Sequence, residues 1–315
     1  MDKPTIEFPT EPTRSVFDSP VATLLLLLMC IFIGYMLGVL FIGLLLGDGL
    51  LYSTGQESSS SLEQLLYGLN KDSSLEDRNL ARTVNFISHL FAFTIPSLLC
   101  MYFIHQRSFL KELQLTKAPK LDNLGLGMVF ILVAIPFTQF TYWLNKQLPL
   151  PTWASSIEEQ TEALIEGLLV MNSPMEFFFS LSLMAILPAI GEELLFRGII
   201  QQKLQNWTKT AHLAIWLSAI IFSLFHLQFE GFIPRMFLGA LLGYLFYWTQ
   251  NLWIPIFAHF IFNGIQVFAQ YALKDQIEEV NLEQATEANW LISLVSLFLL
   301  LILANFIKTR NQINT

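Results

Sequence analysis

Eight apolar runs, separated by polar segments, make up most of the chain. They occupy residues 21–47, 86–104, 124–144, 177–200, 211–227, 232–249, 252–273 and 290–307. Runs of roughly 17–27 residues match the length that an α-helix needs to cross the hydrocarbon core of a bilayer. The pattern therefore predicts an all-α fold, a polytopic membrane helix bundle with about eight transmembrane helices.

Composition and charge support a multi-pass protein whose partner is the lipid bilayer. Hydrophobic residues make up 54% of the chain and charged residues 13%, whereas soluble domains carry about 25% charged residues. The net charge of −8 disfavours nucleic acid as a partner. Lys and Arg are more numerous in the segments on the side of the N-terminus, which predicts cytoplasmic termini in a bacterial inner membrane.

Three ionisable residues interrupt the fourth run. Each of Glu192, Glu193 and Arg197 would cost about 2.5–3.5 kcal/mol at the centre of a membrane helix. Glu193 and Arg197 are four residues apart and are predicted to pair on one helix face. Glu192 points about 100° away from Glu193, so it needs another partner or a cavity.

Two further polar sets lie in later runs. His226 follows Phe222 at the end of the fifth run, and His259 and Asn263 share one face of the seventh. Because ionisable residues inside membrane spans are functional by default, we expect the three sets to converge on one cavity. The remaining histidines lie near the ends of runs and are assigned to the membrane interface: His89, His105 and His212.

These residue types suit hydrolysis of an amide bond. A carboxylate in a pocket of low dielectric is a usable general base for water, and His226 can orient that water or share its proton. His259 and Asn263 can donate hydrogen bonds to the oxyanion of a tetrahedral intermediate. Glu192, His226 and His259 also suit one divalent metal such as zinc. The sequence leaves the metal-bound and metal-free versions open.

The ordered motifs carry a family resemblance. E-E-x-x-x-R at 192–197, F-x-x-x-H at 222–226 and H-x-x-x-N at 259–263 resemble the CPBP (Abi) family. That family groups the type II CAAX prenyl endopeptidases with bacterial bacteriocin-processing and immunity proteins. The resemblance covers about 173–271; the other runs match it in number and hydrophobicity.

The resemblance implies an intramembrane endopeptidase, a hydrolase of the metalloprotease or glutamate-histidine type. Its substrate would be a membrane-associated peptide or protein, either of the prenylated CAAX type or carrying a leader peptide. Glu192 would activate water with His226 as its partner, and His259 with Asn263 would stabilise the oxyanion or complete a metal site. Glu193, Arg197 and Phe222 would support them.

Four regions and two alternative functions follow from these observations. We expect a disordered cytoplasmic tail at 1–20, three transmembrane helices with an acidic loop at 21–172, the catalytic core helices at 173–273 and a last helix and tail at 274–315. A proton-coupled membrane transporter would use the same ionisable residues as a relay. A non-catalytic bacteriocin-immunity or scaffold protein would keep them for structure.

Overall fold

The computed structural model describes residues 19–45, 69–70, 72–273 and 289–313. The tail predicted at 1–20 therefore lies almost entirely outside the described residues. Within them the regular elements are helices, which confirms the predicted all-α fold.

Each predicted apolar run contains a helix within the described residues. In chain order the elements are α1 (Pro20–Leu45), α3 (Leu75–His89), η2 (Leu90–Thr94), α4 (Ile95–His105), η3 (Gln106–Ser108), α5 (Phe109–Glu112), α6 (Leu121–Lys146), α7 (Thr152–Leu169), α8 (Pro174–Leu181), η4 (Ser182–Ile186), α9 (Leu187–Leu195), η5 (Phe196–Gln201), α10 (Gln202–Thr208), α11 (Ala211–Leu224), α12 (Phe232–Thr249), α13 (Trp253–Leu273) and α14 (Trp290–Ile313). Of the described helical runs, six are long and apolar enough to cross a membrane: 20–45, 75–112, 121–146, 174–208, 253–273 and 290–312. α11, with 14 residues, is a shorter apolar helix.

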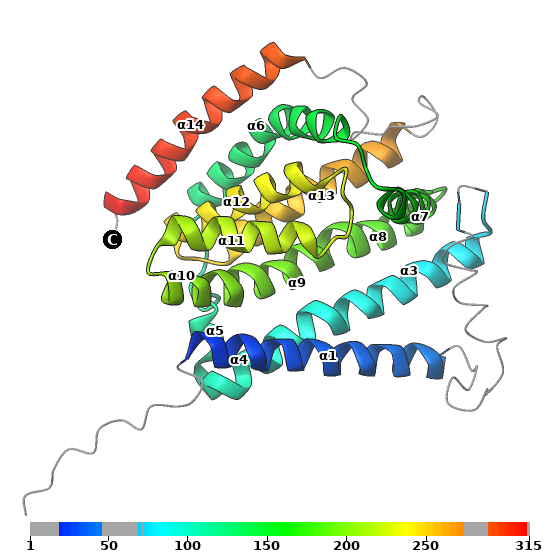
Figure 1. Cartoon of the computed structure of the whole chain (residues 1–315), viewed down its shortest axis with the longest axis horizontal. Coiled ribbons are helices and arrows are strands. Elements are labelled where there is room, and N and C mark those ends of the chain that lie inside the picture. The colour runs from blue at the N-terminus through cyan, green and yellow to red at the C-terminus, as the bar shows by residue number, and fades with distance from the viewer. Residues whose placement is uncertain (1–18, 46–68, 71, 274–288, 314–315) are drawn as a thin grey trace, which may run out of the picture.

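The run from α8 to α10 lies at the centre of the bundle (Figure 1). α1, α3 and α4 pack on one side of it, and α11, α12 and α13 lie on the other, with α6 and α14 beyond them. Many apolar side chains of α1 and α14 remain exposed, as expected for helices that face lipid. The arrangement places α9, which carries Glu192 and Glu193, in the interior.

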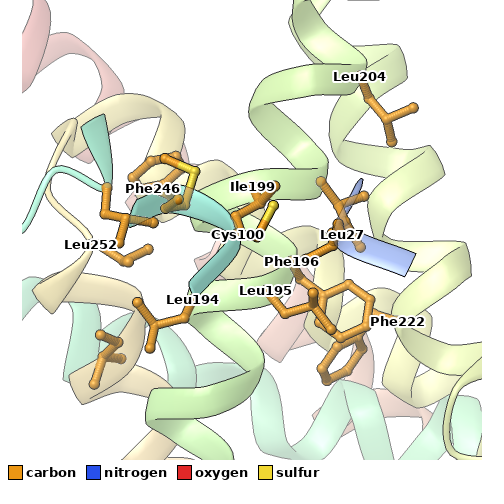
Figure 2. Packing of buried hydrophobic residues seen from close by; sticks show 14 of the residues in the cluster. Leu27, Cys100, Leu194, Leu195, Phe196, Ile199, Leu204, Phe222, Phe246 and Leu252 are labelled. Atoms are coloured by element: carbon orange, nitrogen blue, oxygen red, sulfur yellow. The ribbon is translucent and has the colours of Figure 1, made fainter. Parts of the chain in front are cut away.

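A buried apolar cluster fixes the C-terminal half of α9 and the π turn η5 (Figure 2). Leu195, Phe196 and Ile199 are fully buried there. Their neighbours come from elements on both sides, including Leu27 of α1 and Phe222 of α11. Because side chains in such a cluster interlock, the cluster holds the charged residues of α9 at a defined rotation.

Gly34 of α1 is needed for the close approach of α1 to η2. A Cβ atom at this position would overlap the carbonyl oxygen of Phe91 and lie 2.7 Å from Cγ of Pro96. Gly34→Ala is therefore expected to destabilise the protein by about 1–3 kcal/mol, the usual cost of overpacking, measured as a lower unfolding midpoint in detergent. Gly125→Ala is the control because its Cβ would meet nothing within 4 Å; equal stability of the two variants would contradict the expectation.

The second helical run begins earlier than predicted. The sequence pattern placed residues 75–85 in a polar loop before a span at 86–104, but α3 starts at Leu75. The side chain of Ser74 accepts a hydrogen bond from the backbone N–H of Asp77 and caps the helix. The polar residues that suggested a loop include Arg78 and Arg82, which are buried against Glu176 of α8.

The fifth run ends earlier than predicted. The span drawn at 211–227 places His226 in a helix, but α11 ends at Leu224 and His226 lies in the connection to α12. Leu227 adopts a left-handed conformation with φ of 52°, which a continuing helix does not allow. The short helix lets His226 turn back toward the centre of the bundle.

Candidate active site

Local backbone features bring α9 close to the first helices. The π turns η4 and η5 come directly before and after α9, and η2 packs against it; such turns are frequent at functional sites. Gly191 permits this contact, because a Cβ there would lie 2.7 Å from Oγ1 of Thr94 and 3.0 Å from Cε1 of His89. The polar end of α3 therefore lies directly against the carboxylates of α9.

Glu193 is the centre of a buried ionic group. Its Oε1 is 2.5 Å from Nη1 of Arg197 and 2.9 Å from Nδ1 of His259. Arg197 also donates from Nη2 to the carbonyl of Gly239, at 2.8 Å, and its guanidinium lies over the ring of Phe222. The predicted pairing of Glu193 with Arg197 is confirmed, and Phe222 contacts the pair.

Glu192 is 6% exposed and has contacts on both sides. Its Oε1 lies 3.3 Å from Nε2 of His89, and its Oε2 lies 3.9 Å from Nε2 of His259. The expectation that Glu192 needs a second partner is confirmed. The interfacial assignment of His89 is wrong, because its side chain is only 16% exposed and faces Glu192.

His226 is held by the loop that follows α11. Its Nδ1 lies 2.9 Å from the carbonyl oxygen of Phe222; because a carbonyl accepts, Nδ1 carries the hydrogen and Nε2 of the neutral ring has a free lone pair. A neighbouring helix holds this loop through hydrogen bonds to its backbone. Asn145 of α6 donates from Nδ2 to the carbonyl of Phe229, at 2.6 Å.

Glu158 of α7 fixes the same loop from a third helix. Its Oε2 accepts a hydrogen bond from the backbone N–H of Phe229, at 2.7 Å, and a longer one from Glu230. Burial raises the pKa of the Glu158 carboxyl above its ordinary value, although these two N–H donors act in the opposite direction. The sequence pattern placed this acid in the acidic loop before the catalytic core helices, and no spacing signal linked it to His226.

Asn263 lies one turn after His259 on α13, and its Nδ2 donates to the carbonyl of Met184, at 3.2 Å. A cavity of about 330 Å³ is lined by side chains from all three motifs, among them Glu192, His226, His259 and Asn263. The predicted convergence is therefore found in the structure.

An apolar groove adjoins this cavity. It has a volume of about 450 Å³, runs between α6, α12 and α13, and is lined mainly by apolar side chains such as Ile135, Ile265 and Phe268. The residues common to the groove and the cavity are Arg235, Leu238, Phe262 and Gln266.

The alternative in which Glu192, His226 and His259 bind a divalent metal is not supported by the side-chain positions. Over the part of the chain that the structure describes, no group of three or more His, Cys, Asp or Glu side chains is arranged to hold a metal ion. Glu193 accepts a hydrogen bond from Nδ1 of His259, and the carbonyl oxygen of Phe222 accepts one from Nδ1 of His226. These contacts orient both rings and leave Nε2 of each available to water, substrate or another ligand.

The fold and the site define a helical membrane protein with a carboxylate, two histidines and an asparagine around one internal cavity. Residues 174–265 match the family model described as Rce1-like, type II CAAX prenyl endopeptidase. This match covers all three motifs and confirms the resemblance that they predict.

Two curated relatives have sequences similar to this chain. The "Membrane-embedded CAAX protease MroQ" of Staphylococcus aureus (strain USA300) is 31% identical over 135 residues, which are 40% of this chain and 52% of that protein. The "Uncharacterized protein YpbD" of Bacillus subtilis (strain 168) is 30% identical over 103 residues, 30% of this chain and 50% of that protein. The chain spans about half the length of these relatives. No solved structure matches it. The apolar helices and these similarities identify an integral membrane protein.

Proposed function

We propose that the chain is an intramembrane endopeptidase that hydrolyses a peptide bond of a membrane-associated substrate, with residues 173–273 as its catalytic core. The observation that carries this proposal is the cavity in which Glu192, His226, His259 and Asn263 meet. A buried carboxylate beside two histidines and an amide donor has the parts that amide hydrolysis requires. The match at 174–265 to an endopeptidase family supports the same reaction.

The proposed reaction uses Glu192 as the base. Its Oε2, on the side of His259, takes a proton from a water molecule while the water oxygen bonds to the scissile carbonyl carbon and the carbonyl π electrons move to the oxygen. The free Nε2 of His226 accepts a hydrogen bond from the other O–H of that water and orients it. When the tetrahedral intermediate collapses, the C–N bond breaks and Glu192 returns its proton to the leaving amine.

His259 and Asn263 would stabilise the oxyanion. His259 gives its Nδ1–H to Glu193, so its Nε2 donates only when the ring is an imidazolium. Asn263 uses one N–H of Nδ2 for Met184 and has a second for the oxyanion. Donors placed where charge develops lower the barrier most when they are already fixed in position.

The apolar groove favours a substrate with an apolar anchor. The groove shares residues with the cavity, so an apolar chain lying in it would bring an attached peptide to Glu192. A prenylated CAAX-type peptide has such an anchor, and one curated relative is named as a CAAX protease. A leader peptide with an apolar helix is the other candidate.

Cleavage in liposomes tests the proposal. The probes are a quenched peptide ending in S-farnesylcysteine and three further residues, its unfarnesylated copy and a quenched leader peptide. Asn263→Ala is expected to reduce kcat by about 10²–10³-fold, the usual cost of losing one oxyanion donor. Asn85→Ala is the control, since that side chain donates to Ala81 within its own helix and should leave cleavage unchanged.

Two outcomes would contradict the proposal and support one of the alternative functions. Proton-driven flux of a solute in the same liposomes, without cleavage of any probe, would favour the transporter. A partner protein that is retained equally by wild type and Glu192→Ala, again without cleavage, would favour the scaffold or immunity protein.

A further inference from the structure

His89 lies outside the segment that matches the endopeptidase family, yet its ring contacts the proposed catalytic base. It is the last residue of α3, and the family match covers 174–265. Its Nε2 lies 3.3 Å from Oε1 of Glu192, and both side chains are largely buried. A buried histidine beside a buried carboxylate is a specific arrangement, because an unpaired carboxylate would be costly in this environment.

The geometry fixes which nitrogen of His89 carries hydrogen. A carboxylate oxygen accepts, so Nε2–H donates to Oε1. Nδ1 of His89 is buried and has no hydrogen-bond partner among the described residues. Nε2–H of His89 is therefore the donor to Glu192.

The ring of His89 is held by packing on two sides. It stacks on Phe93, with centroids 4.5 Å apart and planes inclined by 19°. Its Cε1 would lie 3.0 Å from a Cβ at position 191, so only glycine allows the ring to stay this close to α9. The donor thus reaches Oε1 in one orientation.

The two oxygens of Glu192 face different groups. Oε1 faces His89, which is not among the residues that line the cavity, whereas Oε2 is on the side of His259, which does line it. Oε2 is buried and has no hydrogen-bond partner among the described residues. His89 thus holds Oε1 of Glu192, and Oε2 is available to accept a proton.

We propose that His89 is a positioning residue: its Nε2–H holds Oε1 of Glu192, so that Oε2 faces the cavity and accepts the proton of the attacking water. This inference rests on the proposed endopeptidase activity. It adds a residue of the first transmembrane helices to a site otherwise built from α9, α13 and the α11–α12 loop. A displacement of about 1 Å at a catalytic group can cost on the order of 10²-fold in rate, and a carboxylate without its donor is free to rotate by that much.

Three variants separate the hydrogen bond from the packing. His89→Phe keeps a ring against Phe93 but has no donor, His89→Gln has an N–H donor but no ring, and His89→Ala has neither. With the cleaved quenched peptide as substrate, His89→Ala and His89→Phe are expected to lower kcat by about 10²-fold with KM within a factor of about two. His89→Gln should recover most of the lost kcat. His105→Ala, at the end of the same helical run, is the matched control and should behave as wild type.

The outcomes distinguish the inference from the proposed function. If Glu192→Gln is inactive while His89→Phe has the kcat of wild type, His89 does not position Glu192 and only this inference fails. If Glu192→Gln cleaves as wild type does, the role of Glu192 as the base in the proposed function fails first, and with it the reason to position that carboxylate. If wild type cleaves none of the probes, the proposed function itself fails. Should His89→Ala not fold, His89→Phe and His89→Gln still decide, since a wild-type kcat in His89→Phe with a loss in His89→Gln would show that the ring and not the donor matters.

Discussion

Replacing Glu192 with glutamine is expected to reduce kcat for peptide cleavage by about 10²–10⁴-fold, the range that a general base contributes. Glutamine has the size of glutamate, and its side-chain oxygen can still accept the hydrogen bond of His89, so the packing of α9 is retained. It cannot take a proton from water. The loss should therefore fall on kcat, with KM and the unfolding midpoint close to those of wild type.

Steady-state cleavage by purified protein in liposomes measures this effect, with Glu159→Gln as the matched control. Glu159 is an exposed acid of α7, and its replacement makes the same chemical change away from the cavity. A Glu192→Gln protein that keeps more than about a tenth of the wild-type kcat would mean that another group activates the water, because a general base contributes at least about 10²-fold.

The convergence of the three motifs was predictable for a physical reason. Glu192, Glu193 and His259 interrupt apolar runs, and a charged or polar side chain in such a run is stable only against another polar group or a cavity. Once the runs are read as helices of one bundle, their polar residues have few places to meet. The pair at positions 193 and 197 followed from helical spacing alone.

The partners outside these motifs were not predictable in the same way. His89 contacts a residue 103 positions later in the chain, and nothing at helical spacing around it marks that contact. Asn145 and Glu158 hold the loop after α11 through backbone groups, which any sequence supplies. The early end of α11 depends on the backbone at Leu227, although apolar residues continue past it.

A buried ionic group formed by Arg78 and Arg82 of α3 and Glu176 of α8 stabilises the fold. Glu176 of α8 accepts hydrogen bonds from Arg78, at 2.9 Å, and from Arg82, at 3.1 Å. The three side chains are at most 6% exposed. Arg82 also donates to the carbonyls of Leu168 and Val170 at the end of α7. The group thus joins α3, α7 and α8.

Glu176→Ala is expected to lower the free energy of unfolding by about 3–5 kcal/mol, the cost of leaving a buried charge uncompensated. Two neighbouring arginines would remain buried without their carboxylate. Equilibrium unfolding in mixed detergent micelles measures the change, and Glu76→Ala, which removes an exposed acid of α3, is the control with no loss.

Replacing all three charged residues with methionine should be less harmful than Glu176→Ala alone, because a buried ionic group often exchanges for apolar packing at little cost. If the triple variant is the less stable of the two, the hydrogen bonds to the end of α7 matter more than the charge.

The ionic group also affects the candidate active site. Arg82 lies two turns before His89 on α3, and Glu176 lies on α8, which leads through η4 into α9. Glu176→Ala protein that remains folded should therefore lose part of its kcat by letting His89 move away from Glu192.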